Sequence, residues 1–273
     1  MRIDFNKFSL YYKKIINDRN NDKAIVFLHG FTGSSEDWEE ISSRITKKAN
    51  LYFIDLIGHG KSDSPNDVRF YKAEPITKQL LAFFEKIKEK KIFLLGYSMG
   101  GRVALNFAAK YSNLLKGLIL ESSMTGLRKK SEREKRIAND EKIIEFIKSH
   151  SVEEFVDYWM SLDIFKTQKN LSKEKLNKLR KAKIKNNKVG LINSLKGFGA
   201  GKMKPLYSEI RENQIETLLI TGDLDKKYMK LNSAIKNIIP HATHKITQNA
   251  GHNVHLENPQ KFAVVVNEYV EKF

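Results

Sequence analysis

The 273-residue chain contains no cysteine, and it has no apolar run close to the roughly 18 residues that a membrane-spanning helix needs. Because no disulfide can form, nothing in the sequence requires an oxidising compartment. The N-terminal stretch MRIDFNKFSLYYKK also lacks the apolar core and the small-residue cleavage site of a secretory signal. These absences predict a cytoplasmic protein with no membrane span.

Acidic residues are outnumbered: the chain has 32 Asp and Glu against 49 Lys and Arg, a formal net charge of +17. Such an excess is found in proteins that bind nucleic acid, anionic membranes or anionic small molecules. Most of it is lysine in helical patterns, such as residues 85–91 and 171–188, which resemble solvated helix faces. No basic stretch is interleaved with aromatic residues, so we predict no nucleic-acid partner. An anionic small-molecule substrate is expected from the arginines described below. The sequence leaves monomer or homo-oligomer undetermined.

Short β-branched or aromatic runs alternate with amphipathic helical patterns. This alternation is typical of a single α/β domain with a mostly parallel sheet covered by helices. The predicted strands are residues 24–29, 51–56, 91–96, 117–121, 216–222 and 243–248. Residues 35–45 predict a helix capped by Ser35, with Trp38 and Ile45 on one side. Further helices are expected over residues 75–90, directly after Ser98, and from about Pro259 onward.

Residues 127–202 interrupt this alternation, because they contain no convincing strand and are typical of consecutive helices. Ser151 and Glu154 have the spacing of a capping box, and Trp159 on the same helix either packs the helices together or lines a pocket. An all-helical block between two strands predicts a lid over the carboxyl ends of the strands, where open α/β sheets bind ligands. We therefore expect a core of residues 1–126 and 203–273 and a lid of residues 127–202.

The stretch GYSMGGR, residues 96–102, follows a predicted strand and opens a predicted helix. This succession of strand, sharp turn and helix raises a serine hydroxyl out of the sheet, which makes Ser98 a candidate catalytic residue. Gly96 and Gly100 would let the strand and the helix approach each other without a Cβ clash. Because GxSxG also occurs by chance, the pattern gains its weight from this context.

Such a serine needs a histidine and an acid, and in this architecture both follow it in the chain, the acid first. Asp225 comes after the strand at 216–222, and His252 lies in NAGHNVH after the last predicted strand. We favour His252 because Ala-Gly before it permits a tight turn, and Asp225 would accept a hydrogen bond from its Nδ1. The alternatives are Asp223 or Glu121 as the acid and His241, His244 or His255 as the base.

Two backbone amides are expected to face the same site. The segment LHGFTGSS forms a loop, shaped by His29 and Gly30, in which the Phe31 amide can point toward the serine. The Met99 amide follows the serine directly. Together they predict an oxyanion hole, which stabilises negative charge as it develops on a substrate oxygen.

Arg102 lies in the first turn of the helix after Ser98, where the helix dipole opposes an exposed cation by roughly 0.3–1 kcal/mol. Either it is solvated or forms an ordinary ion pair, or it binds a substrate carboxylate with both arms of its guanidinium. Arg136 and Arg180 favour carboxylate binding, because they lie on the predicted lid among lysines. Other arginines such as Arg128 show that residue type alone does not decide.

Taken together, these motifs resemble one family, the 2-succinyl-6-hydroxy-2,4-cyclohexadiene-1-carboxylate synthases of menaquinone biosynthesis, which have the α/β-hydrolase fold. The likeness extends over nearly the whole chain. It is carried by LHGFTGSSEDW, DLIGHGKS, GYSMGGRVAL, GLILESS, RIAND, FVDYW, GFGAG, TGDLDKKY and AGHNVHLENP. Many α/β-hydrolases share the first and last of these segments, whereas GYSMGGR and the lid motifs are more particular to the synthases.

The resemblance implies roles for ten residues. They are the triad Ser98, Asp225 and His252, the oxyanion-hole residues Phe31 and Met99, and the substrate-binding residues Arg102, Arg136, Arg180, Tyr97 and Trp159.

The resemblance also implies a carbon–oxygen lyase that needs no metal or organic cofactor. Its reaction eliminates pyruvate from the tricarboxylate 5-enolpyruvoyl-6-hydroxy-2-succinyl-cyclohex-3-ene-1-carboxylate and gives 2-succinyl-6-hydroxy-2,4-cyclohexadiene-1-carboxylate. Ser98 would then act as a base, and the oxyanion hole would stabilise an enolate. A serine carboxylesterase with the same triad, or a hydrolase-like binding protein with an idle triad, are the alternative functions.

Overall fold

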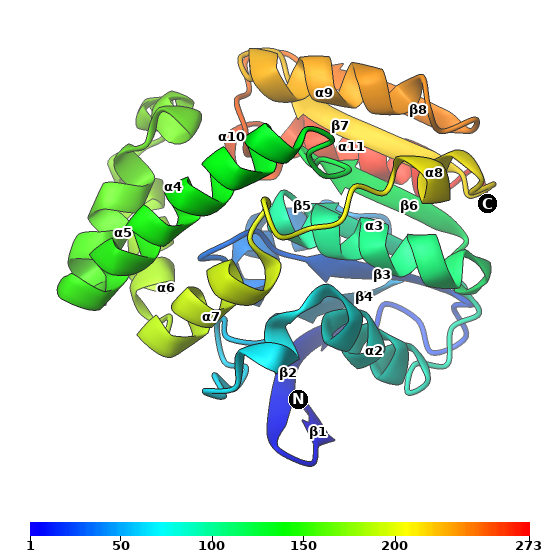
Figure 1. Cartoon of the computed structure of the whole chain (residues 1–273). Coiled ribbons are helices and arrows are strands. Elements are labelled where there is room, and N and C mark those ends of the chain that lie inside the picture. Colours follow the sequence, from blue (N-terminus) through cyan, green and yellow to red (C-terminus); the bar gives the residue numbers. More distant parts are fainter.

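An eight-stranded sheet runs through the centre of the molecule, and the computed structural model describes all of residues 1–273 (Figure 1). The strands lie in the order β1-β2-β4-β3-β5-β6-β7-β8. Their bounds are β1 Arg2–Phe5, β2 Phe8–Ile15, β3 Lys23–Leu28, β4 Asn50–Ile54, β5 Lys91–Tyr97, β6 Gly117–Glu121, β7 Thr217–Gly222 and β8 Ala242–Thr247. Strands β3 to β8 pair in parallel, whereas β2 is antiparallel to both β1 and β4. All six predicted strands are confirmed, and the N-terminal hairpin of β1 and β2 is an addition.

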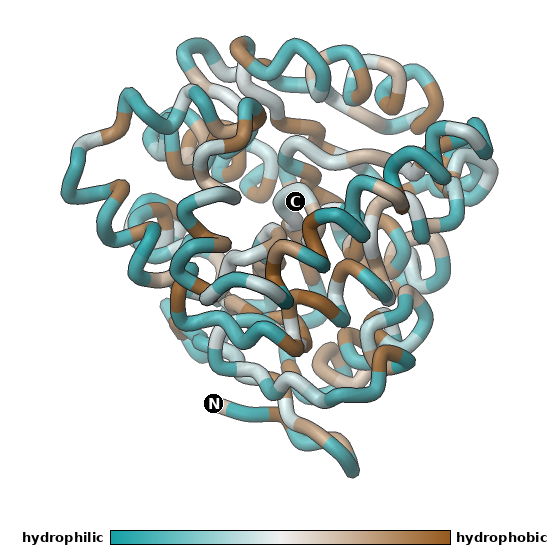
Figure 2. The backbone as a smooth tube through the Cα atoms, turned by 60° about the vertical axis from the view of Figure 1, so that its left-hand side comes forward, coloured by the Kyte–Doolittle hydropathy of each residue, from teal (hydrophilic) through white to brown (hydrophobic).

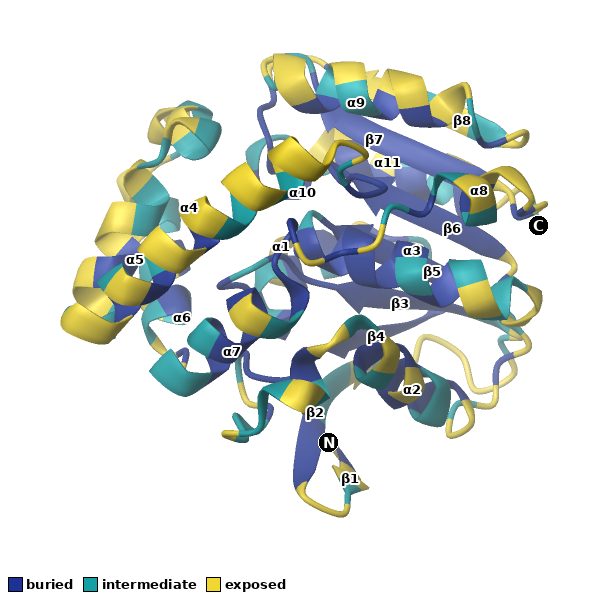
Figure 3. Ribbon diagram, in the orientation of Figure 1, coloured by how far each residue is buried: buried dark blue, intermediate teal, exposed yellow.

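Helices cover both faces of this sheet (Figure 1). One face carries α2 (Ala73–Phe84), α3 (Met99–Tyr111), α8 (Tyr207–Arg211) and α9 (Lys226–Lys236), and the other carries α1 (Glu39–Ser42), α10 (Val254–Glu257) and α11 (Pro259–Val270). Each face has its own apolar core, with Phe83 and Phe107 in the first and Trp38 and Phe262 in the second. The central strands between the two cores are buried (Figure 3). Because β3 to β8 are parallel, their carboxyl ends meet at one edge of the sheet.

The helices predicted after Ser98 and from Pro259 are confirmed by α3 and α11. Two other predictions need correction. Helix α2 ends at Phe84 instead of continuing toward residue 90, and Glu89 then turns inward to accept a hydrogen bond from Tyr52 Oη at 2.9 Å. The cap near residue 35 is Ser34, whose side chain accepts from the Glu36 amide, and a 3₁₀ turn over Ser35–Trp38 precedes the short α1.

Between β6 and β7 the chain forms helices and turns only. In order they are α4 (Lys130–Ser149), α5 (Val152–Ser161), a 3₁₀ segment (Asp163–Asn170), α6 (Lys173–Ile184), α7 (Lys188–Phe198) and then α8. The predicted capping box of Ser151 and Glu154 is confirmed at the start of α5. Helices α4, α5 and α7 share a small apolar core around Ile147, Phe155 and Leu191. In Figure 2, hydrophilic (teal) and hydrophobic (brown) residues are interspersed along the helical turns of the chain.

No helix in the chain combines the length and the apolar character that crossing a bilayer requires.

Candidate active site

The stretch GYSMGGR forms a sharp turn from β5 into α3. Ser98 occupies the turn with φ 50° and ψ −103°, a strained conformation for a residue with a side chain. A Cβ on Gly96 would collide with the backbone of Gly100, and one on Gly100 would collide with the backbone of Leu28 in β3. Both glycines are therefore needed for the close approach of strand and helix, and the turn presents Ser98 to a cavity.

His252 and Asp225 reach this serine from the loops that follow β8 and β7. His252 Nε2 lies 3.1 Å from Ser98 Oγ, and His252 Nδ1 lies 2.7 Å from Asp225 Oδ2. The His252 and Asp225 side chains are only 2% and 8% exposed. When Nδ1–H donates to the carboxylate, Nε2 is left as the acceptor for the serine hydroxyl. The three residues therefore have the geometry of an activated serine.

The other acids and histidines have different partners. Asp223 Oδ1 accepts a hydrogen bond from the Ala250 amide at 3.3 Å. Glu121 and His255 form a buried pair with each other, with 2.6 Å between Oε2 and Nδ1. Asp225 is thus the acid that contacts His252. The other two histidines considered from the sequence also have partners of their own, which are Thr221 and Ser233 for His244 and Gln214 and Glu216 for His241.

The two residues of the predicted oxyanion hole line the same cavity as the serine. These residues are Phe31, in the loop after β3, and Met99. The Phe31 amide donates to no other group of the protein, and Met99 is the first residue of α3, so its amide has no acceptor within the helix. His29 fixes the base of the loop, because its Nε2 accepts from the Leu56 amide at 3.0 Å. Both amides are available to a negatively charged oxygen.

Ser98 and His252 open into a cavity of about 260 Å³ between the sheet and the helices α4, α5 and α7. Eleven of its 17 lining residues are hydrophobic, and few polar groups face the ligand space, which is the usual character of a small-molecule site. The polar and charged lining residues are Ser98, Arg102, Arg136, Asn139, Ser194 and His252.

Arg102 is a buried cation without a carboxylate partner. Its Nη1 donates to the Phe198 carbonyl at 2.6 Å, and its guanidinium lies 4.9 Å from the centre of the Phe198 ring. Burial, together with the nearby charge of Arg136, lowers the pKa of Arg102 to about 10. A buried charge of this kind is unfavourable unless an anion compensates it. The ordinary ion pair considered from the sequence is therefore not formed.

Arg136 extends from α4 into the same cavity. Its Nε donates to Asp140 Oδ1, one turn further along the helix, at 2.8 Å. The second oxygen of Asp140 is buried and has no partner. Because one carboxylate faces two guanidinium groups, the cavity keeps an excess of positive charge close to Ser98.

Two large aromatic residues complete the wall of the cavity. Trp159 contacts Phe31 edge-on, with 5.0 Å between ring centres, and its buried indole N–H has no partner. Both alternatives for Trp159 hold, because it lines the cavity and also packs against the apolar core of the lid helices. Tyr228, which the sequence analysis missed, lies 4.5 Å from the His252 ring. The sequence could have indicated Tyr228, because it lies three residues after Asp225, in the first turn of α9 and thus close to the triad.

Known proteins share both the fold and the length of this chain. A family model described as alpha/beta hydrolase fold matches residues 23–259. A protein of Bacillus subtilis (strain 168), provisionally named 2-succinyl-6-hydroxy-2,4-cyclohexadiene-1-carboxylate synthase, is 37% identical over 251 residues, which cover 92% of this chain and 91% of that protein. The synthase of the same name from Klebsiella pneumoniae (strain 342) is 30% identical and covers 86% of this chain and 88% of its own length. The chain belongs to this synthase family.

A solved structure supports the assignment to the synthase family. The structure of MenH from S. aureus superimposes with a TM-score of 0.92 at 29% identity, over 96% of this chain and 98% of that one. The agreement therefore includes the helices between β6 and β7 as well as the sheet.

One of the three arginines expected from the synthase family is not at the cavity. Arg180, on α6, donates from Nε to Asp157 Oδ1 at 2.6 Å and from Nη2 to Glu153 Oε1 at 2.7 Å. These two carboxylates raise its pKa further and hold the side chain on the outside of α5 and α6. The structure therefore does not place Arg180 at the site, contrary to the prediction. The cation that α6 turns inward is Lys183, whose Nζ donates to Thr32 Oγ1 at 3.1 Å.

Tyr97 also lies elsewhere than the synthase resemblance implied. It is the last residue of β5, it is buried, and it does not line the cavity. Its ring packs 5.4 Å from His252 and 5.0 Å from His255, and burial raises the pKa of its hydroxyl well above the usual value. Tyr97 thus supports the His252 ring from behind the cavity.

Stability at mildly acidic pH should depend on a histidine behind the site. The His59 ring packs at a tilt against His29, with 5.1 Å between ring centres, and its Nδ1 lies 3.2 Å from the Ile57 carbonyl. Burial lowers the pKa of His59 to about 3, while an unfolded histidine titrates near 6.5. Between these values the unfolded chain binds a proton that the folded chain does not, so stability falls as the pH falls through this window.

As the pH falls from 7.5 to 5, protonation of His59 in the unfolded chain should lower the free energy of unfolding by about 2 kcal/mol. His59→Asn keeps a donor near the Ile57 carbonyl and lacks the titrating ring, so its stability should decline less over the same range. Urea denaturation of both proteins at the two pH values measures the difference. Equal declines in the two proteins would contradict the prediction.

Proposed function

We propose that the chain is a carbon–oxygen lyase of menaquinone biosynthesis that eliminates pyruvate from 5-enolpyruvoyl-6-hydroxy-2-succinyl-cyclohex-3-ene-1-carboxylate. The product is 2-succinyl-6-hydroxy-2,4-cyclohexadiene-1-carboxylate. The proposal carries over to this chain the activity that its synthase relatives are named for.

In this reaction Ser98 acts as a base and forms no acyl intermediate. Its Oγ takes the proton from ring carbon 2, next to the succinyl ketone, while its own hydrogen moves to His252 Nε2. The electron pair of the broken C–H bond moves onto the ketone oxygen as an enolate, which the amides of Phe31 and Met99 stabilise. Asp225 stabilises the imidazolium that forms on His252.

The enolate then collapses through the ring. Its electron pair returns to form the double bond between carbons 2 and 3, the existing double bond shifts to carbons 4 and 5, and the bond between carbon 5 and the ether oxygen breaks. The leaving group is enolpyruvate, which takes up a proton and becomes pyruvate. Electrons and protons balance without an external oxidant or reductant.

One observation carries this proposal: Ser98 and His252 face a cavity that is lined by two guanidinium groups and no carboxylate, and only Arg136 has a carboxylate partner, Asp140. A neutral ester would not compensate the charge of Arg102. A substrate with three carboxylates would, because a carboxylate can accept two parallel hydrogen bonds from a guanidinium.

The test is pyruvate release from the enolpyruvyl substrate, coupled to lactate dehydrogenase and measured beside hydrolysis of a simple aryl ester. We expect the enzyme to accelerate pyruvate release far above the spontaneous loss and to hydrolyse the ester about a hundredfold less efficiently or worse. Pyruvate release at the spontaneous rate would exclude the synthase function. Efficient ester hydrolysis in its place would favour a carboxylesterase.

A further inference from the structure

The loop that carries the Phe31 amide contains a strained residue. Thr32, the next residue, has φ 65°, in the left-handed region that β-branched residues avoid. Such a strained conformation persists only where neighbouring groups hold it. The φ angle of Thr32 orients the peptide between Phe31 and Thr32, whereas the Phe31 amide belongs to the peptide before it. Relaxation of Thr32 would therefore move Phe31, so the groups that hold Thr32 also fix the position of Phe31 in the loop.

Asn186, between α6 and α7, holds the loop from the lid side. Its Nδ2 donates to the Thr32 carbonyl at 2.8 Å and to the Lys183 carbonyl at 2.9 Å. Its Oδ1 accepts from the Gly60 amide at 3.1 Å, in the loop after β4. One buried side chain thus joins the end of a lid helix to two loops of the core.

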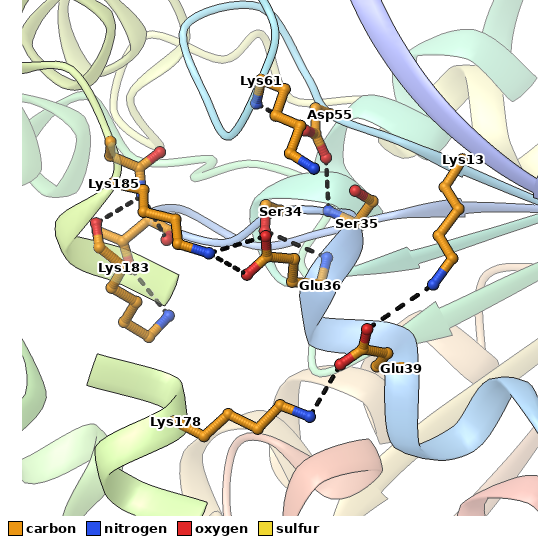
Figure 4. A network of polar contacts seen from close by, with 12 residues as sticks. Lys13, Ser34, Ser35, Glu36, Glu39, Asp55, Lys61, Lys178, Lys183 and Lys185 are labelled. Carbon is orange, nitrogen blue, oxygen red and sulfur yellow. Dashed lines mark hydrogen bonds and ion pairs between the residues drawn. The ribbon is translucent and has the colours of Figure 1, made fainter. Parts of the chain in front are cut away.

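Ion pairs fix α6 against the core at the same place. Two lysines, one on α6 and one directly after it, form ion pairs with glutamates that follow the loop of Phe31 and Thr32 in the chain (Figure 4). The pairs are Lys178 with Glu39 at 2.8 Å and Lys185 with Glu36 at 2.9 Å. Lys183, between these lysines, adds its hydrogen bond to Thr32 Oγ1. Both the backbone and the side chain of Thr32 are therefore held by α6 and its C-terminal end.

We propose that Asn186 is a positioning residue, which holds Thr32 in its left-handed conformation and thereby aims the Phe31 amide at the developing enolate oxygen. The proposal rests on the proposed function, in which that amide stabilises the enolate. Asn186 does not line the cavity, so it acts through the loop and not on the substrate. Its loss should lower kcat, which depends on stabilising the developing charge, and leave KM nearly unchanged.

Two variants test this role. Asn186→Ala removes every contact of the side chain, and Asn186→Asp keeps its shape and the acceptor for Gly60 but lacks the donors to Thr32 and Lys183. We expect each to lower kcat for pyruvate release about ten- to hundredfold, which is part of the 10²–10³-fold effect of losing an oxyanion donor. Hydrogen–deuterium exchange of residues 29–35, followed by mass spectrometry, should accelerate in both variants.

Asn193→Ala is the matched control. Asn193, on α7, is also a buried lid asparagine that bonds to core carbonyls, those of Pro65 at 3.2 Å and Asn66 at 3.0 Å. Its loss should lower Tm about as much as Asn186→Ala does, with kcat and the exchange of residues 29–35 unchanged. Equal kcat losses at the two asparagines, or unchanged loop exchange in both Asn186 variants, would overturn the proposal. If the wild-type enzyme releases no pyruvate, the proposed function fails, and loop exchange still decides whether Asn186 positions the loop.

Discussion

Ser98→Ala is expected to lower kcat for pyruvate release about 10²- to 10⁴-fold, the range that a positioned general base contributes. Alanine has no atom in the place of Oγ, which lies 3.1 Å from His252 Nε2, so no proton can pass from the substrate through the serine to the histidine. KM should change little, because the arginines remain in the cavity. The loss of one hydrogen bond, worth about 1 kcal/mol, should lower Tm by no more than a few degrees. Coupled pyruvate release and thermal denaturation measure the two effects.

Ser123→Ala is the control for this experiment. Its hydroxyl is buried close to Ser98 and donates to the Ser98 carbonyl at 3.1 Å, so it contacts the backbone and does not face the cavity. Removing it deletes the same kind of atom in the same neighbourhood, yet kcat should stay within about threefold of wild type. A Ser98→Ala variant as active as wild type would instead indicate an idle triad, as in a binding protein.

The triad was predictable from the sequence because strand ends are easy to locate. Ser98, Asp225 and His252 follow β5, β7 and β8, and the carboxyl ends of parallel strands meet at one edge of the sheet. The sequence favoured Asp225 over Asp223 as the acid, although an aspartate directly before a helix is also in place to cap that helix. Asp225 performs both roles: Oδ1 accepts from the Tyr228 amide at the start of α9, and Oδ2 bonds to His252.

The segment of residues 127–202 was predictable as helices, but the rotation of each helix about its axis was not. Arg180 and Lys183 lie three residues apart on α6, and the rotation of the helix decides which of them faces the core. Leu179 is buried, and Lys183 lies four residues after it on the same side, whereas Arg180 faces the acidic side chains of α5. The spacing of four residues from the buried Leu179 therefore indicates that Lys183 faces inward. The prediction chose Arg180 because arginine is the better carboxylate ligand.

The N-terminal hairpin was missed for a different reason. Only Phe8, Ser9 and Leu10 of β2 are buried, and the rest of the strand is partly or fully exposed. β1 has four residues, two of them charged. A strand at the edge of a sheet alternates too weakly between apolar and polar residues to be distinguished from a loop.

Arg102→Met is expected to change activity and stability in opposite directions. Methionine has a flexible chain but no charge, so the variant should lower kcat/KM about 30- to 1000-fold, as expected when one partner of a buried charge pair is lost. The free energy of unfolding should rise by about 1–3 kcal/mol, because the resting protein no longer holds a buried cation without a carboxylate partner. The Phe198 carbonyl loses its donor, which offsets about 1 kcal/mol of this gain. Pyruvate release and urea denaturation give the two numbers.

Arg180→Met is the control, which shows whether the loss of an arginine outside the cavity has the same effect on kcat/KM and stability as Arg102→Met. The charge of Arg180 is already compensated by Asp157 and Glu153 outside the cavity, so kcat/KM should stay within about twofold of wild type and stability should not rise. Arg102→Lys keeps the charge but loses the two-armed geometry, and it should fall between Arg102→Met and wild type in kcat/KM. If Arg102→Met lowered both stability and kcat/KM, Arg102 would be a structural residue. A rise in stability with a fall in kcat/KM would mean that a substrate carboxylate, and no group of the protein, compensates the charge of Arg102.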